Sequence, residues 1–184
     1  HLFKAKVHVA LNTILNNQEL EEARALAFTL YDKGVDALII QDVGLLEGPL
    51  PPLEIHASTQ QDNTTPEKVL FLEKLGFKQA VLARELSIND IKKIREKAKN
   101  IKLEAFIHGA MCTSYSGRCV MSNYVTKRDS NRGGCSQVCR FVFDNDTDYE
   151  YAFSSKDLNM LEYLPQGLPN VAASFSPISI LERL

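Results

Sequence analysis

Short apolar segments alternate with amphipathic stretches along the first 107 residues of the chain. Brief runs rich in Val, Ile and Leu are typical of buried strands, whereas apolar positions spaced three and four residues apart indicate helices. The pattern predicts five strands, at 6–11, 37–40, 54–57, 80–83 and 103–107. It predicts helices at 19–31, from Pro66 to the residue before Gly76, and after Ser87. Strands and helices in strict alternation predict βαβ units and a parallel sheet.

The expected helices carry recognisable end signals. Thr65 precedes Pro66, a favourable pair for an N-cap and a first helical position. Ser87 and Asp90 have the spacing of a capping box, with Asp in place of the usual Glu or Gln. Gly34 and Gly76 stand where the first two helices should end. These signals support the assignment of helices between the strands.

Polar side chains recur where the predicted strands end. Parallel strands joined by right-handed crossovers form either a barrel or a doubly wound sheet, and a barrel gathers its active-site groups at the carboxyl ends of its strands. The pattern therefore favours an α/β fold with a parallel (β/α) barrel-like domain. Polar residues also follow strands simply because loops begin there. The residues in question are Asn12, Gln41, Asp42, His56, Ser58, Arg84, Glu85 and His108.

The length of 184 residues suits a single catalytic domain, 1–184, which includes a cysteine loop at 110–143. Five or six βα units are fewer than the eight of a closed barrel, so the barrel is expected to be incomplete. Lys and Arg number 21 against 23 acidic residues, which excludes a general affinity for polyanions through net charge. No apolar run suggests a membrane span or a signal peptide, and we expect a soluble, cytoplasmic protein with no membrane partner.

All four cysteines lie in one segment of the chain, with six, fifteen and three residues between them: Cys112, Cys119, Cys135 and Cys139. Four thiolates can hold either tetrahedral zinc or a cubane iron-sulfur cluster. Zinc sites usually bring cysteines in pairs two to four residues apart, and only the second pair has that spacing. The spacing therefore favours the cluster, against the alternative of four unrelated buried thiols.

Three segments carry a resemblance to a known family. They are Glu-Ala-Phe-Ile-His-Gly-Ala-Met-Cys at 104–112, Tyr-Ser-Gly-Arg-Cys-Val-Met-Ser at 115–122 and Asn-Arg-Gly-Gly-Cys-Ser-Gln-Val-Cys-Arg at 131–140. Together they closely resemble the signature of the collagenase-like peptidase family, peptidase family U thirty-two. The resemblance extends back through 34–42, 56–60 and 81–87, and covers nearly everything up to about residue 160.

The resemblance implies a catalytic (β/α) barrel whose four matching cysteines hold a four-iron four-sulfur cluster, with zinc as a possible substitute in air-grown crystals. Its better understood members are RNA hydroxylases that act on a tRNA wobble uridine or an rRNA cytidine, with prephenate implicated as the oxygen donor. Segments 56–63 and 65–69 are more similar to the ribosomal-RNA branch. Family chains begin with earlier βα units and carry a basic strand motif where this chain reads 172–177, so N-terminal units and part of the C-terminal region are expected to be missing.

An RNA hydroxylase needs positive charge and aromatic rings beside its cofactor. Between the first cysteine and the residue after the last, five basic residues face only one acidic residue, Asp129. Arginines near thiolates can equally balance the negative charge of a cluster. The candidate RNA-binding residues are Arg118, Lys127, Arg128, Arg132, Arg140, Tyr115 and Tyr124.

A peptidase, the alternative function, would need a different apparatus. The sequence contains neither a His-Glu-x-x-His motif nor a Gly-x-Ser-x-Gly elbow. Glu104 and His108 share one face of the last predicted strand, where they could serve as an acid-base pair or support Cys112. A non-catalytic scaffold with a metal knuckle is a further alternative. The candidate catalytic residues are His108, Glu104, Asp42, His56, Arg84 and Glu85.

Overall fold

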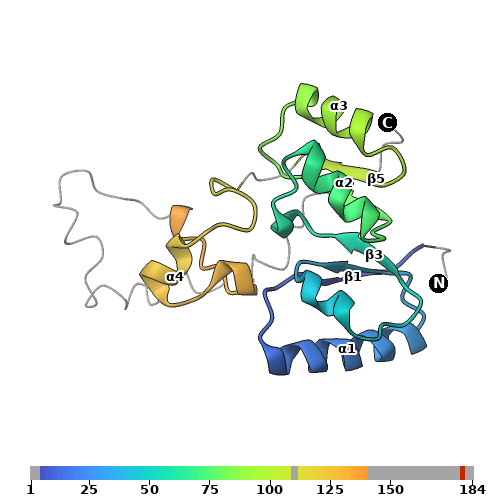
Figure 1. The fold of residues 1–184 in the computed structure, drawn as a ribbon. Coiled ribbons are helices and arrows are strands. Elements are labelled where there is room, and N and C mark those ends of the chain that lie inside the picture. The colour runs from blue at the N-terminus through green and yellow to red at the C-terminus, as the bar shows by residue number, and fades with distance from the viewer. Residues whose placement is uncertain (1–4, 109–111, 141–178, 181–184) are drawn as a thin grey trace, which may run out of the picture.

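The computed structural model describes residues 5–108, 112–140 and 179–180, and these form one sheet with helices packed against it (Figure 1). The six strands are β1 (His8–Leu11), β2 (Ala37–Ile40), β3 (Glu54–Ala57), β4 (Gln79–Val81), β5 (Lys102–Phe106) and β6 (Ser179–Ile180). The helices are α1 (Asn17–Asp32), α2 (Pro66–Lys74), α3 (Ile88–Lys97) and the short α4 (Met121–Thr126). Short 3-10 turns are η1 (Val43–Glu47), η2 (Thr59–Gln61), η3 (Ser130–Arg132) and η4 (Val138–Arg140).

The strand order is sequential, from β1 to β6. The pairs from β1·β2 to β4·β5 are parallel, which confirms the predicted parallel sheet over its first five strands. β6 differs from that prediction because it pairs antiparallel with β5, with Ile180 opposite Ala105. Sequential order is what a barrel requires. In the described ranges β1 and β6 stand at the two ends of the order and do not pair, so the sheet is open here and barrel closure stays a prediction.

Side-chain caps set the starts of the three longer helices. Thr65 accepts a hydrogen bond from the Lys68 amide at 3.2 Å, and Ser87 and Asp90 form the predicted capping box. α1 begins two residues earlier than predicted because Asn16 and Glu19 form a second capping box, at 3.0 and 2.8 Å. The two additional helical residues, Asn17 and Gln18, are polar, so the spacing of apolar residues did not place them in the helix.

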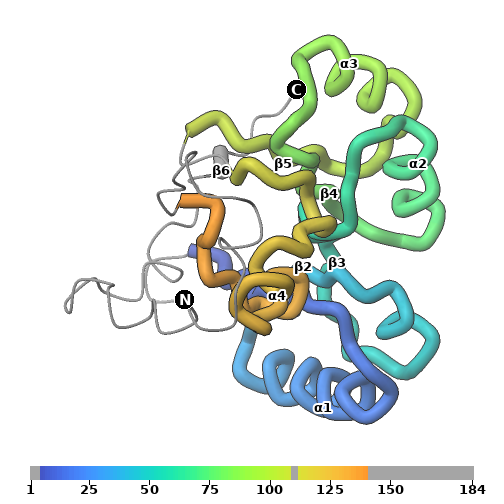
Figure 2. The backbone as a smooth tube through the Cα atoms, turned by 90° about the vertical axis from the view of Figure 1, so that its left-hand side faces the viewer, coloured from blue at the N-terminus to red at the C-terminus, as the bar shows by residue number. Residues whose placement is uncertain are grey.

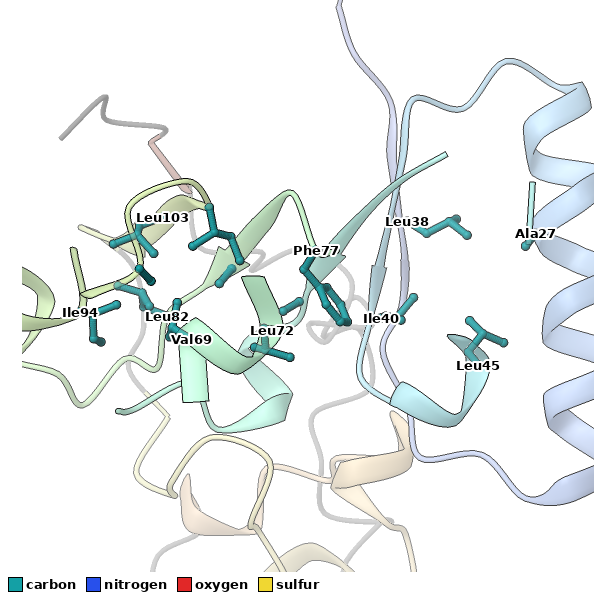
Figure 3. Packing of buried hydrophobic residues seen from close by; sticks show 14 of the residues in the cluster. Ala27, Leu38, Ile40, Leu45, Val69, Leu72, Phe77, Leu82, Ile94 and Leu103 are labelled. Atoms are coloured by element: carbon teal, nitrogen blue, oxygen red, sulfur yellow. The ribbon is translucent and has the colours of Figure 1, made fainter. Parts of the chain in front are cut away.

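The helices α1, α2 and α3 lie along one face of the sheet (Figure 2). Their buried positions, among them Ala27, Leu72 and Ile94, pack on strand residues such as Leu38 and Leu103 (Figure 3). Burial of such side chains contributes about 1.5–3 kcal/mol each, so this layer is the main source of stability. None of the helices in the described ranges is long and apolar enough to cross a membrane.

The opposite face of the sheet carries buried polar side chains among apolar ones such as Ile39 and Val81. His56 is 1% exposed, Gln79 2% and Glu104 9%. These residues alternate with the apolar positions that face the helices, as side chains along a strand must. The buried polar groups of the sheet therefore lie on the face away from the helices.

Candidate active site and cysteine loop

The described part of the predicted cysteine loop is the segment 112–140, which we call the cysteine loop from here on. It lies beside the carboxyl ends of the strands (Figure 1). The loops that follow β1, β3 and β4 all contact it. The Ile14 amide, after β1, donates to the Asn131 carbonyl oxygen at 3.4 Å. The contacts of the other strand ends are closer and involve Ser116, Gly117 and Arg118. The cysteine loop thus docks on the edge where a parallel α/β fold places its active site.

Ser116 is fully buried and is held by the loop after β4. Its amide donates to Glu85 Oε1 at 3.2 Å, and its hydroxyl donates to Glu85 Oε2 at 3.1 Å. Thr59, in the turn after β3, donates to the Leu82 carbonyl oxygen at 3.1 Å and lies 3.4 Å from the Ser116 hydroxyl. Ser116 is therefore fixed to two neighbouring strand ends at once.

Gly117 passes so close to the turn after β3 that only glycine fits. Its φ is +73°, and an added Cβ would lie 2.0 Å from the Gln60 carbonyl oxygen. That same oxygen accepts a hydrogen bond from Gln41 Nε2, after β2, at 3.2 Å. The contact consequently joins the cysteine loop to the ends of both β2 and β3.

Two ion pairs complete the docking. Arg118 pairs with Asp62 after β3, and Arg132 pairs with Glu19 in the first turn of α1. The Asn16 amide lowers the pKa of Glu19 and Arg132 lowers it further, although burial acts in the opposite direction. Two of the five predicted RNA-binding cations are thereby engaged within the protein.

The other three cations, Lys127, Arg128 and Arg140, are exposed and make no ion pair within the described ranges. Tyr115 is 70% exposed and Tyr124 65%. These five residues are all exposed on the cysteine loop.

Cys119 is the most elaborately surrounded of the cysteines. Its carbonyl oxygen accepts hydrogen bonds from the Ser130 hydroxyl at 3.0 Å and Asn131 Nδ2 at 2.7 Å. Burial raises the pKa of its thiol. Hydrogen bonding by the nearby Ser130 hydroxyl, the amides of Ser122 and Met121, and the Ser114 hydroxyl outweighs burial, so the pKa is lowered overall. The site stabilises a thiolate, the form that binds metals.

The segment that carries Cys135 and Cys139 is hydrogen-bonded to the short helix α4. The Ser136 amide, next to Cys135, donates to the Ser122 hydroxyl at 2.9 Å, and the Ser136 hydroxyl lies 2.7 Å from Thr126 Oγ1. Cys135 Sγ accepts from the Gln137 amide at 3.4 Å. All four cysteines are free thiols. Within residues 5–108 and 112–140, however, no three His, Cys, Asp or Glu side chains are arranged to hold a metal ion, so the expected convergence of the thiols is not seen here.

Asp42, a predicted catalytic residue, makes structural contacts with both of its oxygens. Oδ1 accepts from the Gly44 amide at 2.9 Å and caps η1, while Oδ2 accepts from the Leu15 amide at 3.1 Å. Asp42 therefore fixes the loops after β1 and β2 to one another.

His56 lies within β3, as the predicted bounds of that strand imply, and it is buried. Its Nε2 is 3.3 Å from Glu54 Oε2, and its ring packs edge-on against His8 with centroids 4.9 Å apart. Burial lowers the pKa of His56, and the Glu54 carboxylate opposes that effect. Its Nδ1 is buried with no hydrogen-bond partner among the described residues.

Glu104 and His108 make no hydrogen bond to each other within the described residues, and their joint role stays a prediction. Glu104 accepts a hydrogen bond from Gln79 Nε2, its neighbour on β4, whereas His108 is exposed beyond the end of β5. Arg84, after β4, keeps a buried Nε without a partner in the described part of the chain. The predicted catalytic residues thus divide between the strand ends and the buried polar face.

Several residues of the site were absent from the sequence-based candidates, namely Thr59, Gln60, Asp62, Glu19, Ser116 and Gly117. Gly117 offered one signal, a glycine inside the Tyr-Ser-Gly-Arg-Cys motif. The others are ordinary polar residues whose partners lie up to 113 positions away in the chain.

The open parallel sheet with a four-cysteine loop docked at its carboxyl edge defines an α/β domain of enzyme type. The model of peptidase family U32 matches residues 1–173, and the chain belongs to that family.

Curated relatives divide between RNA modification and proteolysis. The chain is 52% identical over 143 residues to the 23S rRNA 5-hydroxycytidine C2501 synthase of Escherichia coli, covering 78% of this chain and 22% of that protein. It is 38% identical over 180 residues to tRNA hydroxylation protein P1 of Bacillus subtilis, with coverages of 89% and 42%. It is 28% identical over 179 residues to a collagenase of Porphyromonas gingivalis, with coverages of 86% and 43%. The chain spans less than half the length of each of these relatives.

Proposed function

We propose that this protein is an RNA hydroxylase that modifies a pyrimidine, with an iron-sulfur cluster held by its four cysteines. The observation that carries the proposal is the docked cysteine loop, which presents four free thiols beside the polar carboxyl ends of β1 to β4. Relatives named for rRNA and tRNA hydroxylation support it, and the 52% identity to the cytidine synthase favours an rRNA cytidine over a tRNA uridine.

The four cysteine thiols are chemically suited to hold an iron-sulfur cluster. Thiolates are the usual cluster ligands, and hydrogen bonds to their sulfurs tune the reduction potential. Cys119 and Cys135 already receive such hydrogen bonds. When bound, the cluster supplies electron-transfer chemistry, and the loop must draw its thiols together to hold it, as metal-coupled folding commonly does. Cys112, Cys119, Cys135 and Cys139 are the proposed ligands, with zinc as a substitute in air.

The exposed surface of the cysteine loop suits single-stranded RNA. Lys127, Arg128 and Arg140 are free to contact phosphates, and the rings of Tyr115 and Tyr124 are positioned at the surface for stacking on unpaired bases. Arg118 and Arg132 are assigned to docking instead, because both are paired with carboxylates. This division refines the set of five cations expected from the sequence.

The oxygen atom is proposed to come from a small organic acid of the prephenate type. Arg84 follows β4 and has a buried Nε with no hydrogen-bond partner among the described residues, so its guanidinium is suited to bind a carboxylate. His56, Glu104 and His108 are further candidates for acid-base work beside the substrate. A protein of this function is expected in the cytoplasm, where its RNA is found.

A peptidase is the second candidate, favoured by the family name and by the collagenase among the relatives. The site offers it little support. In the described ranges no Ser, Thr or Cys side chain hydrogen-bonds to a histidine, the arrangement on which nucleophilic proteolysis rests.

The two functions are separated by comparing RNA from a strain that lacks the gene with RNA from the same strain after the gene is restored. Mass spectrometry of digested rRNA and tRNA should find a hydroxylated pyrimidine only in the restored strain. Identical RNA from both strains, together with gelatin cleavage by the purified protein, would establish the peptidase in its place.

A further inference from the structure

We propose that Glu85 is a positioning residue that fixes the first half of the cysteine loop over the sheet edge, and not an acid-base catalyst. The inference rests on the proposed function, since it assigns a role within that same site. Glu85 follows β4 directly after Arg84, where sequence alone suggests catalysis.

Both carboxylate oxygens of Glu85 are committed to one residue. Oε1 accepts the Ser116 amide at 3.2 Å and Oε2 accepts the Ser116 hydroxyl at 3.1 Å. Ser116 is 0% exposed, whereas Glu85 itself is exposed, so its carboxylate reaches from the surface to a buried serine.

The contact between Glu85 and Ser116 matters because Ser116 lies between the first two cysteines. Ser116 stands four residues after Cys112 and three before Cys119. The next residue, Gly117, is pressed against the Gln60 carbonyl oxygen, and Arg118 pairs with Asp62. The segment between the first two cysteines is therefore anchored at three successive residues, and Glu85 is the anchor from β4. Loss of this anchor frees Cys112 and Cys119 to move relative to the strand ends.

The test compares three variants of the intact protein: Glu85→Ala, Glu85→Gln and, as a control, Glu96→Ala, which removes an exposed carboxylate on α3. Amide hydrogen exchange at Ser116 is measured first, in protein without added iron. Exchange should accelerate roughly tenfold or more in Glu85→Ala, since a charge-assisted hydrogen bond is lost. It should change less in Glu85→Gln, whose carbonyl still accepts the amide, and not at all in Glu96→Ala.

The second measurement is RNA hydroxylation in the deletion strain. It asks whether the conservative variant Glu85→Gln restores the modification. A positioning role predicts that Glu85→Gln retains most of the modification and that Glu85→Ala loses most of it. If Glu85→Gln abolishes hydroxylation while the Ser116 amide stays protected, Glu85 acts as an acid or base and the inference is overturned. Unchanged exchange in Glu85→Ala overturns it as well. If the wild-type gene restores no hydroxylation, the proposed function fails, and the exchange data alone still decide the docking role.

Discussion

Gly117 and Gln60 approach each other more closely than any side chain would permit: a Cβ on Gly117 would lie 2.0 Å from the Gln60 carbonyl oxygen. The two residues belong to the cysteine loop and to the turn after β3, so their contact sets the distance between the thiol-bearing segment and the sheet. The cysteine loop can therefore dock on this turn only because residue 117 is a glycine, which has no Cβ.

Replacement of Gly117 by Ala should displace the cysteine loop, because the Gln60 backbone cannot yield without disturbing η2. Gly76→Ala is the matched control, since Gly76 also has a positive φ, +99°, but its Cβ would meet nothing within 4 Å. The control should lose only about 1–2 kcal/mol of unfolding free energy from backbone strain. Limited proteolysis should cut the loop faster in Gly117→Ala alone. Equal cleavage of both variants would show that the close approach is unimportant.

The apolar layer makes a separate prediction about stability. Leu72→Ala should lower the free energy of unfolding by about 2–5 kcal/mol, because Leu72 is 1% exposed and its loss leaves a cavity beneath α2. Phe71→Ala, one position away on the outer side of the helix, is 55% exposed and should cost under about 1 kcal/mol. Urea denaturation measures both. A larger loss at Phe71 would contradict the assignment of the inner face.

His56 should make the protein sensitive to acid. Its folded-state pKa lies below the ordinary value of 6.5, chiefly through burial, so the unfolded chain binds the proton more readily. The contribution of neutral His56 to the free energy of unfolding is therefore present above about pH 6.5 and is lost as the pH falls below that value. Denaturation midpoints of His56→Asn should depend less on pH between about 7.5 and 5 than those of the wild type. An unchanged dependence would mean that other groups govern acid unfolding.

The division of the basic residues predicts two different phenotypes. Arg128→Ala should weaken RNA binding and reduce the dependence of log affinity on log salt by about one phosphate contact, with the loop still docked. Arg118→Ala removes the partner of Asp62 and should loosen the loop instead. Filter binding at several salt concentrations, combined with proteolysis of the loop, separates these effects. If the slope of log affinity against log salt is the same in Arg128→Ala as in the wild type, Arg128 does not contact RNA phosphate.

The sequence predicted the regular part of the fold well, for physical reasons visible in particular elements. Strands β2 and β3 both have the predicted bounds. β2 is a continuous apolar run, whereas β3 includes the polar Glu54 and His56 and was marked out by the proline-rich segment 48–52 before it. β4 begins one residue earlier and ends two residues earlier than expected, since polar Gln79 joins the ladder while apolar Leu82 and Ala83 are buried beyond it. α4 escaped prediction because its six residues carry no amphipathic pattern.

The candidate site was harder to predict, because its roles depend on long-range contacts. Nothing in the local sequence shows that Asp42 would cap η1 or that Glu85 would hold a serine 31 positions away. The pairing of β6 with β5 joins residues about 75 positions apart and likewise leaves no local trace. Motifs located the cysteine loop, whereas only the structure showed which polar residues dock it and which remain exposed.

We propose that RNA hydroxylation depends on the thiolates of the cysteine loop, and Cys119→Ser tests this dependence most directly. The variant keeps the carbonyl oxygen that Ser130 and Asn131 bind, so the loop should remain folded while a cluster ligand is lost. The measurement is the fraction of hydroxylated pyrimidine in rRNA and tRNA from a deletion strain that carries either the wild-type gene or the variant. Our account predicts hydroxylation with the wild type and none with Cys119→Ser. Full hydroxylation with the variant would contradict it.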